Sequence, residues 1–491
     1  MDLSDIPDPN LSNDWEKEAA VQHELGVEAE AVLRLGLMLM GAGTAGYRVI
    51  RGMKRAARAL GFNALDAIVG VNSITCTFKE GERFRTMVAV QQKPGIHASR
   101  IEALEDLTHH LHHRITVDDL NEALDFIEEH INQRFHPAAL VAAAGVACAA
   151  FAVLNHYAWA EIPIVGVAAA LGQWVRMVLT NKNFNQLGTV AVAGAVAALG
   201  YFAVTVGLDA LGVLVTDSRN FAAGYVAAAL FLIPGFPLFS SLLDLSRFDI
   251  TAGVARMTYA LSVIVTATIS VGMVSAVTGL NPLPTVAAEP PPYWPLIAAI
   301  ASFLGVAGFS MLFQSSRRMV VTAAAVGTVG NLLRLAMISH GIQHQYAAFV
   351  AGCVIGLVAA VFANTMRIPR ITVTVPAAVI MIPGVAMYKS MYFLNSYDLD
   401  QAISNAADAA LVVLFITAGL ATARMMTDRN WTFGRLIDFD KPLRPEDDLP
   451  AHERHPRGTA GQRTLLGEVT FRMLGSSAQH LPLHRSKDST Q

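Results

Sequence analysis

One long stretch of the chain, residues 138–425, is almost free of charge. It holds 12 Lys/Arg and 9 Asp/Glu among its 288 residues, about 7%, whereas 15% of the whole 491-residue chain is charged. A soluble core of this length would carry more charge, and a charged side chain at the centre of a bilayer costs several kcal/mol. The stretch therefore predicts a membrane-spanning region.

The apolar stretch divides into ten segments long enough to cross about 30 Å of hydrocarbon. They are residues 138–157, 161–179, 186–206, 221–243, 254–279, 294–313, 319–339, 346–364, 371–392 and 405–425. In the connections between them, eight Lys/Arg fall on the side of the N-terminal part and three on the opposite side. Because positive residues favour the cytoplasmic side, we expect a multi-pass inner-membrane protein with both termini in the cytoplasm.

An Ile-Pro-Gly sequence occurs twice in the apolar stretch, at a constant offset of 149 residues. Ile233-Pro234-Gly235 lies in the fourth segment and Ile382-Pro383-Gly384 in the ninth. Each is fourth in a set of five, and an odd number of crossings makes the two sets enter the membrane from opposite sides. The sequence thus predicts a 5+5 inverted repeat with halves at 138–279 and 294–425.

Each Ile-Pro-Gly sequence predicts a break inside its helix. Proline removes an amide donor and clashes with the preceding turn, and glycine relaxes the backbone. Broken backbone inside a membrane is tolerated where it lines a cavity or is buried in protein, and a half-helix N-terminus suits a carboxylate. Two matched breaks predict one central site. The alternative is a pair of proline kinks that serve packing alone.

Several polar residues in or beside the predicted spans are candidates for proton or charge relay. They are Asp244, Asp249, Arg256, Asn331, Arg334 and Lys389. An ionisable group within a membrane must pair, reach the interface or line water. For Asp244 and Asp249 the alternative is a solvated loop, and for Arg334 and Lys389 it is an extended side chain that reaches the membrane surface.

The parts that flank the apolar stretch are polar. Residues 1–24 read as a tail and residues 25–137 as a small α+β domain. We expect helices at 28–40, 47–60, 99–113 and 117–131, the last capped by Thr116, and a hairpin of two strands at 64–78 and 83–90. Residues 426–491 read as a second tail.

The glycine-rich motif, the histidine cluster and the cysteines do not predict a cofactor or metal site, and the net charge does not predict nucleic-acid binding. Gly41-Ala-Gly-Thr-Ala-Gly46 matches a dinucleotide fingerprint, but a helix precedes it, which favours a tight turn between two helices. The histidines of His109-His110-x-His112-His113 lack accompanying Cys or carboxylates, which favours an exposed helix end. The three cysteines are far apart and read as small apolar residues, and the net charge of −3 gives no sign of nucleic-acid binding.

Over about residues 25–425 the chain resembles the threonine/serine exporter family. The resemblance rests on Leu35-Gly36 through Gly43, Tyr47-Arg48-Val49, Leu232-Ile-Pro-Gly235, the Asp244–Arg256 stretch and Ile382-Pro-Gly with Tyr388, Ser390 and Met391. It implies export of small hydroxylated amino acids, driven by the proton motive force, by ten helices and a cytosolic N-terminal domain. The family's N-terminal domain has been likened to a hydrolase, but this sequence shows no catalytic triad, so we expect no enzymatic activity. A similar pair of shorter bacterial proteins is associated with dicarboxylate export.

The resemblance and the breaks together give a set of expected roles. For the substrate we expect Pro234, Gly235, Ser241, Asn331, Pro383, Gly384, Tyr388 and Ser390; for proton coupling Asp244 and Asp249; and as charge partners Arg256, Arg334 and Lys389. The partners are then a small amino acid, protons and lipid, with homo-oligomer formation left open. The alternatives are a dicarboxylate exporter of the same fold, and a membrane-anchored enzyme or sensor that uses residues 25–137.

Overall fold

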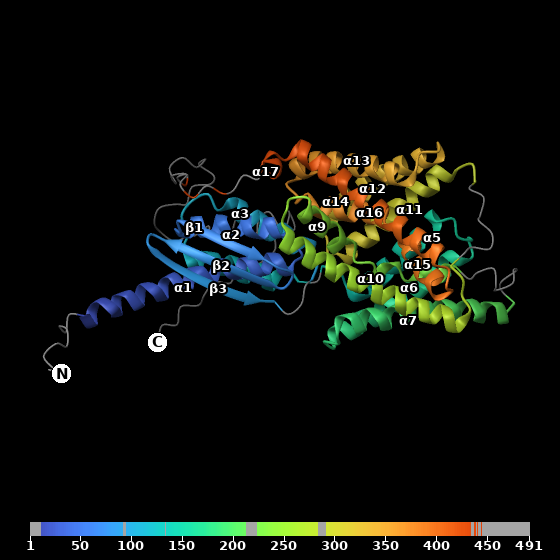
Figure 1. Cartoon of the computed structure of the whole chain (residues 1–491), viewed down its shortest axis with the longest axis horizontal. Helices are drawn as coiled ribbons and strands as arrows, with labels where there is room; N and C mark the ends of the chain where they lie inside the picture. Colours follow the sequence, from blue (N-terminus) through green and yellow to red (C-terminus); the bar gives the residue numbers. More distant parts are fainter. Residues whose placement is uncertain are drawn as a thin grey trace, which may run out of the picture.

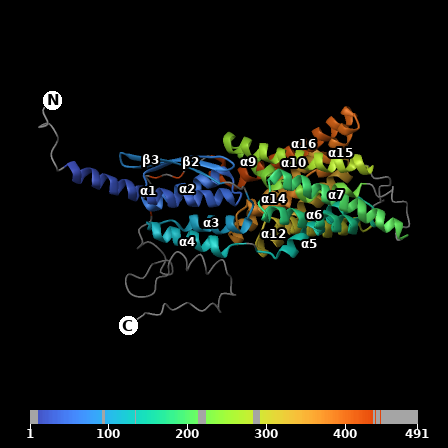
Figure 2. The same cartoon turned by 90° about the horizontal axis from the view of Figure 1, so that it is seen from below.

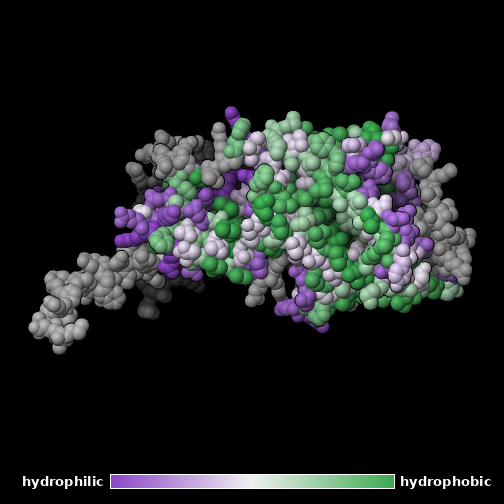
Figure 3. Space-filling view, in the orientation of Figure 1, coloured by the Kyte–Doolittle hydropathy of each residue, from purple (hydrophilic) through white to green (hydrophobic). Residues whose placement is uncertain are grey.

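The structure is a computed structural model that describes residues 11–91, 95–132, 134–212, 223–282 and 291–433, with residues 437, 439 and 443. For residues 11–24 and 430 it describes the backbone alone. The expected tail at 426–491 and the connection between the two membrane halves therefore lie largely outside the described residues. A polar N-terminal domain stands at one end of the molecule and an apolar helical domain at the other (Figures 1 and 3).

The N-terminal domain has three layers, which Figure 2 shows from the side. Helices α1 (Leu11–Gly41) and α2 (Gly46–Leu60) form the middle layer, between the sheet and the pair α3 (Ala98–His110) and α4 (Val117–His130). The expected cap of α4 is confirmed, because the Thr116 side chain accepts a hydrogen bond from the Asp119 backbone N–H. α1 begins before the expected residue 28, since residues 11–24 contain no proline or glycine.

The sheet has three strands where the sequence predicted two, so the single strand expected at 64–78 was wrong. Strands β1 (Ala64–Val69), β2 (Ser73–Glu80) and β3 (Arg83–Val90) form an antiparallel sheet in the order β1-β2-β3. The expected run turns back on itself at residues 70–73, where the Gly70 N–H donates to the Ser73 carbonyl at 2.8 Å. Glycine favours such a turn, and the alternating apolar residues on both sides had concealed it.

The membrane domain contains the remaining helices. They are α5 (Pro137–Leu154), α6 (Glu161–Asn181), α7 (Gln186–Ala210), α8 (Gly224–Ala228), a short 3₁₀ helix η3 (Leu230–Leu232), α9 (Gly235–Leu245), α10 (Ile250–Thr278), α11 (Trp294–Leu312), α12 (Arg317–Ser339), α13 (His344–Met366), α14 (Ile371–Val379), α15 (Gly384–Asn395), α16 (Leu399–Thr427) and α17 (Arg429–Thr432). Within the described residues eight helices are long and apolar enough to cross a membrane alone. The pairs α8–α9 and α14–α15 are bent by 60° and 49°, which gives ten spans if each pair counts as one. The predicted helical membrane fold with a small α+β domain is confirmed.

The helices of the two halves pack in matching pairs. α9 packs against α14 and α16. Its counterpart α15 packs in the same way against α8 and α10, which are the counterparts of α14 and α16. α5 packs against its counterpart α11, where a β-carbon at Gly308 would lie 2.7 Å from the Ala143 carbonyl oxygen. Small residues of this kind let two membrane helices approach closely. The matched contacts place both broken pairs at the centre of the domain.

Candidate functional site

The two breaks have the same backbone geometry. Pro234 has φ −80° and ψ 62°, and Pro383 has φ −78° and ψ 58°. In both, the N–H of the following glycine donates to the carbonyl of the preceding isoleucine at 2.8 Å. This is an inverse γ-turn, and a new helix starts at the glycine. The predicted helix breaks are therefore present in both halves.

Each break packs against the other in a reciprocal way. The partners are Val379 and Ile382 for Gly235, and Leu230 and Ile233 for Gly384. A β-carbon at either glycine would come within 2.8 or 2.5 Å of these side chains, so the contact requires glycine. The partner positions are themselves related by the offset of 149, so the contact has the form of a pseudo-two-fold axis between the breaks.

The three hydroxyl groups predicted to bind substrate have hydrogen-bond partners within the protein. The Ser241 hydroxyl donates to the Leu238 carbonyl of its own helix, and the Ser390 hydroxyl donates to the Ala402 carbonyl of α16, each at 2.8 Å. Tyr388 donates to the Ala229 carbonyl across the two halves at 3.2 Å. The bonds of Ser390 and Tyr388 fix α15 against its neighbours.

The predicted polar group of α12 forms a small network of its own. The Asn331 side-chain amide donates to the Ser302 hydroxyl at 2.8 Å, and the Arg334 Nε donates to the Asn331 side-chain oxygen at 3.1 Å. Arg334 and Lys389 are absent from the lining of the large cavity described next. The structure therefore does not bring the predicted substrate-binding set into one place.

A cavity of about 600 Å³ lies between the N-terminal domain and the first membrane half. Its wall is formed by the end of α1 and the loops at residues 71 and 95–96, by α6 and α7, by the first break, by α10 and by the end of α11. The polar and charged residues of the wall are Arg176, Thr180, Asn183, Asn185, Gln186, Thr189, Ser240, Arg256 and Tyr259. Of the predicted site residues, Pro234 and Arg256 line this cavity.

The cavity wall is positively charged. Among the described residues that line it, two are Arg and none is Asp or Glu. Arg176 lies beside the break, with Nη1 3.5 Å from the Phe231 carbonyl oxygen. A guanidinium group presents a planar fork of donors that matches a carboxylate, so the wall suits an anionic group next to the broken helix.

The second arginine, Arg256, is held in an ion pair at the floor of the cavity. Its Nη1 lies 3.0 Å from Asp244 Oδ2, and Asp244 is fully buried. Its Nη2 donates to the Thr44 carbonyl of the N-terminal domain at 2.6 Å. The nearby Asp249 packs beside Gly46 at the start of α2. Both predicted proton-coupling residues therefore lie where the N-terminal domain meets α9 and α10.

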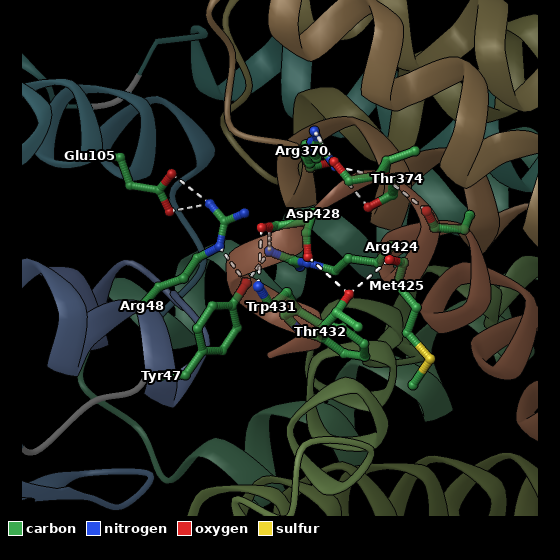
Figure 4. Close-up of polar contacts among 12 residues, drawn as sticks. Tyr47, Arg48, Glu105, Arg370, Thr374, Arg424, Met425, Asp428, Trp431 and Thr432 are labelled. Carbon is green, nitrogen blue, oxygen red and sulfur yellow. Dashed lines mark hydrogen bonds and ion pairs between the residues drawn. The ribbon is translucent and has the colours of Figure 1, made fainter. Parts of the chain in front are cut away.

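Tyr47 is the centre of a second junction between the domains (Figure 4). The Arg247 guanidinium lies over the Tyr47 ring, 4.2 Å from its centre. Arg424 of α16 donates to the Tyr47 hydroxyl. Arg424 also lies near the ring of Trp431, which is buried. Cations over aromatic faces contribute about 0.5–2 kcal/mol each, so Tyr47 joins the N-terminal domain to both membrane halves.

Arg48, the next residue in the chain, places its positive charge beside the Tyr47 hydroxyl. It pairs with Glu105 of α3 at 2.5 Å, and its Nε donates to the Tyr47 hydroxyl at 2.8 Å. Burial opposes the charge of Arg48, but the Glu105 carboxylate outweighs it and raises the guanidinium pKa above its usual value. Arg48 is thus charged at any physiological pH.

The glycine-rich motif and the histidine cluster both lie in the N-terminal domain. Residues 41–46 connect α1 to α2, as predicted, and dock on the membrane domain through Thr44 and Gly46. His109 and His112 are exposed at the end of α3 and just beyond it, as the sequence predicted. In the part of the chain that the structure describes, no three His, Cys, Asp or Glu residues are grouped as a metal would require.

Sequence reasoning missed the main polar residues of the cavity. None of Arg176, Gln186 and Tyr259 was assigned to a site from the sequence. Gln186 donates to the Tyr259 hydroxyl at 2.5 Å across α7 and α10. An arginine in an otherwise apolar helix was the available signal, since such residues often face a water-filled cavity.

Models of known protein families match both halves of the chain. A family model described as "Putative threonine/serine exporter" matches residues 30–278, and one described as "Threonine/Serine exporter, ThrE" matches residues 298–426. The chain belongs to the threonine/serine exporter family. The two matches cover the N-terminal domain with the first half, and the second half, so one chain contains both family modules.

Two curated relatives of this chain are shorter. A protein of Escherichia coli (strain K12) named "Probable succinate transporter subunit YjjP" is 26% identical over 257 residues, which cover 51% of this chain and 95% of the relative. The protein of the same name from Klebsiella aerogenes is 25% identical over 262 residues, with the same coverage. No solved structure matches the chain.

Proposed function

We propose that this chain is a secondary transporter that exports small amino acids such as threonine and serine. The observation that supports it best is the cavity of about 600 Å³ whose wall joins Arg176 to the first helix break. A volume of this order accommodates a small metabolite. The family's description names the same substrates.

Recognition of the amino acid would use three kinds of group. The carboxylate would pair with Arg176, in the bidentate manner that guanidinium groups favour. The side-chain hydroxyl would meet the amide and hydroxyl groups of Asn183, Gln186 and Tyr259, which share the cavity wall. Backbone carbonyls beside the break, such as that of Phe231, would accept hydrogen bonds from the ammonium group.

The transport cycle would use the two halves as an inverted repeat. The reciprocal contact of Gly235 and Gly384 supports this, because rocking of one half against the other about the breaks would close the cavity and open a related path. With the N-terminal domain in the cytoplasm of the inner membrane, the present cavity is the cytoplasmic one. Asp244 or Asp249 would exchange the coupling proton where the domains meet.

The N-terminal domain would act as a gate rather than as an enzyme. It contributes Met40, Gly43, Val71, Gly95 and Ile96 to the cavity, and none of these side chains is ionisable. Catalysis by a domain of this kind would require polar side chains that converge on a substrate. Docking through Thr44 and Tyr47 instead couples its position to α10 and α16.

A second candidate substrate is a small dicarboxylate. The cavity wall has two guanidinium groups and, among the described residues, no carboxylate, which favours an anion over a zwitterion. The curated relatives carry succinate in their names. Arg176 and Arg256 would then each hold one carboxylate, provided that Asp244 releases Arg256.

Efflux from loaded cells tests the proposal. Cells with and without this protein are loaded with dipeptides of threonine or serine, and the efflux of the free amino acids is followed, with succinate efflux as the comparison. We expect faster threonine or serine efflux when the protein is present. Faster succinate efflux alone would favour the dicarboxylate, and unchanged efflux of all three at normal membrane levels would contradict both.

A further inference from the structure

A second buried carboxyl group lies at the end of the membrane domain away from the N-terminal domain. α5 starts at the junction with that domain, so the start of α6 lies at the opposite end, and Glu161 is the first residue of α6. Its exposed fraction is 2%. The Tyr201 hydroxyl of α7 donates to Glu161 Oε2 at 2.9 Å.

Glu161 differs from Asp244 in its lack of a cationic partner. Asp244 pairs with Arg256, whereas among the described residues no Lys or Arg faces Glu161. The groups around it are the phenols of Tyr201 and Tyr157 and the backbone N–H groups of Ala158 and Gly224. A buried carboxylate without a counter-charge is costly, so a change in the access of water to Glu161 would be coupled to uptake or release of a proton.

Buried hydroxyl groups continue from Glu161 toward the helix breaks. Tyr157, just before α6, is 4% exposed, and its hydroxyl has no hydrogen-bond partner among the described residues. Tyr225 of α8 lies near Tyr157, and Tyr388 of α15 lies near Tyr225. Tyr388 in turn donates to Ala229 beside the first break. Buried phenols therefore lie both beside the carboxyl group of Glu161 and beside the first break.

We propose that Glu161 is a proton-binding residue that couples the proton gradient to transport. The cavity opens on the N-terminal side of the breaks, while the end at Glu161 is closed by Tyr157, Tyr201 and Tyr225. When the opposite conformation opens that end, Glu161 meets the external solution and takes up or releases its proton there. The proposal rests on proton-driven export by this chain and adds a proton-binding residue at the end of the membrane domain opposite Asp244 and Asp249.

Transport by purified protein in liposomes tests the role of Glu161. Threonine or serine exchange without a pH gradient is compared with uptake driven by a pH gradient, for wild type, Glu161→Gln and the control Asp408→Asn, which changes an exposed acid of α16. We expect Glu161→Gln to exchange within about twofold of wild type but to lose stimulation by the gradient. The control should keep both activities. Stimulation of Glu161→Gln equal to that of wild type would overturn the proposal.

Tyr201→Phe gives a second and independent readout. The variant lacks one hydrogen-bond donor to the carboxylate. The pH midpoint of its gradient-driven transport should therefore lie about one unit above that of wild type. An unchanged midpoint in Tyr201→Phe would overturn the role. If Glu161→Gln also loses exchange, Glu161 serves packing. Wild type that exchanges but ignores the gradient also overturns the role, whereas wild type without any transport overturns the proposed function itself.

Discussion

At the scale of single residues, the two arginines of the cavity differ in what neutralises them. Arg256 is paired with the buried Asp244 and bonded to Thr44, whereas no Asp or Glu of the described chain faces Arg176. A charge that is already paired within the protein contributes less to ligand binding than a charge that has no partner before the ligand binds. Arg176 is therefore the residue that should bind the substrate carboxylate.

Replacement of Arg176 by Gln should weaken substrate binding about ten- to a hundredfold, because a charge-assisted hydrogen bond is lost. Binding of threonine, serine and succinate to purified protein measures the effect. Lys182→Gln, which removes an exposed positive charge directly after the last residue of α6, is the matched control and should bind as wild type. Equal affinities for wild type and Arg176→Gln would exclude this carboxylate site.

The Asp244–Arg256 pair should behave as a unit in stability measurements. Arg256→Gln leaves Asp244 buried without its partner and should cost about 3–5 kcal/mol. The double variant with Asp244→Asn should recover part of that loss, because no unpaired charge stays buried. Thermal unfolding in detergent of both single variants and the double variant gives the coupling energy, and additive losses would show that the pair is not coupled.

At the scale of elements, the two broken helices hold each other in place. Leu at Gly235 or at Gly384 would overlap side chains of the opposite break, and overpacking typically costs about 1–3 kcal/mol. Either variant should lower the unfolding temperature and abolish transport. Gly207→Leu in α7 is the control, since no atom lies within 4 Å of a β-carbon there. Normal transport by Gly384→Leu at wild-type membrane levels would refute the role of the breaks.

Local features of the elements could be predicted from the sequence, and contacts between distant residues could not. Long apolar runs and Ile-Pro-Gly act within a few residues, so the spans and both breaks were located correctly. The meeting of Gly235 with Val379 and of Glu161 with Tyr201 depends on tertiary packing, which leaves no local signal. Arg176 drew no site prediction, because the cavity that it lines is built from elements far apart in the sequence.

At the scale of the whole molecule, the N-terminal domain is fastened to both membrane halves. Ser99 donates to the Gln314 carbonyl at 2.8 Å, Thr44 accepts from Arg256, and Tyr47 meets Arg247 and Arg424. Movement of one half against the other must therefore strain or break some of these contacts. The domain is in a position to sense the transport cycle.

Tyr47→Ala should loosen this attachment, since it removes the ring beneath Arg247 and the hydroxyl that Arg424 contacts. Hydrogen exchange of the 41–47 loop should become faster while the core of the N-terminal domain keeps its protection. Tyr47→Phe retains the ring and should show a smaller effect. Identical exchange in wild type and Tyr47→Ala would mean that Tyr47 does not hold the domains together.

One chain, with both halves and a cavity at its first break, should transport a small carboxylate by itself. Purified protein reconstituted alone into liposomes tests it directly, with labelled threonine, serine and succinate and an imposed pH gradient. We predict saturable uptake of at least one of the three that the gradient stimulates and Arg176→Gln reduces. Uptake by the folded protein that is no faster than in protein-free liposomes would contradict the account.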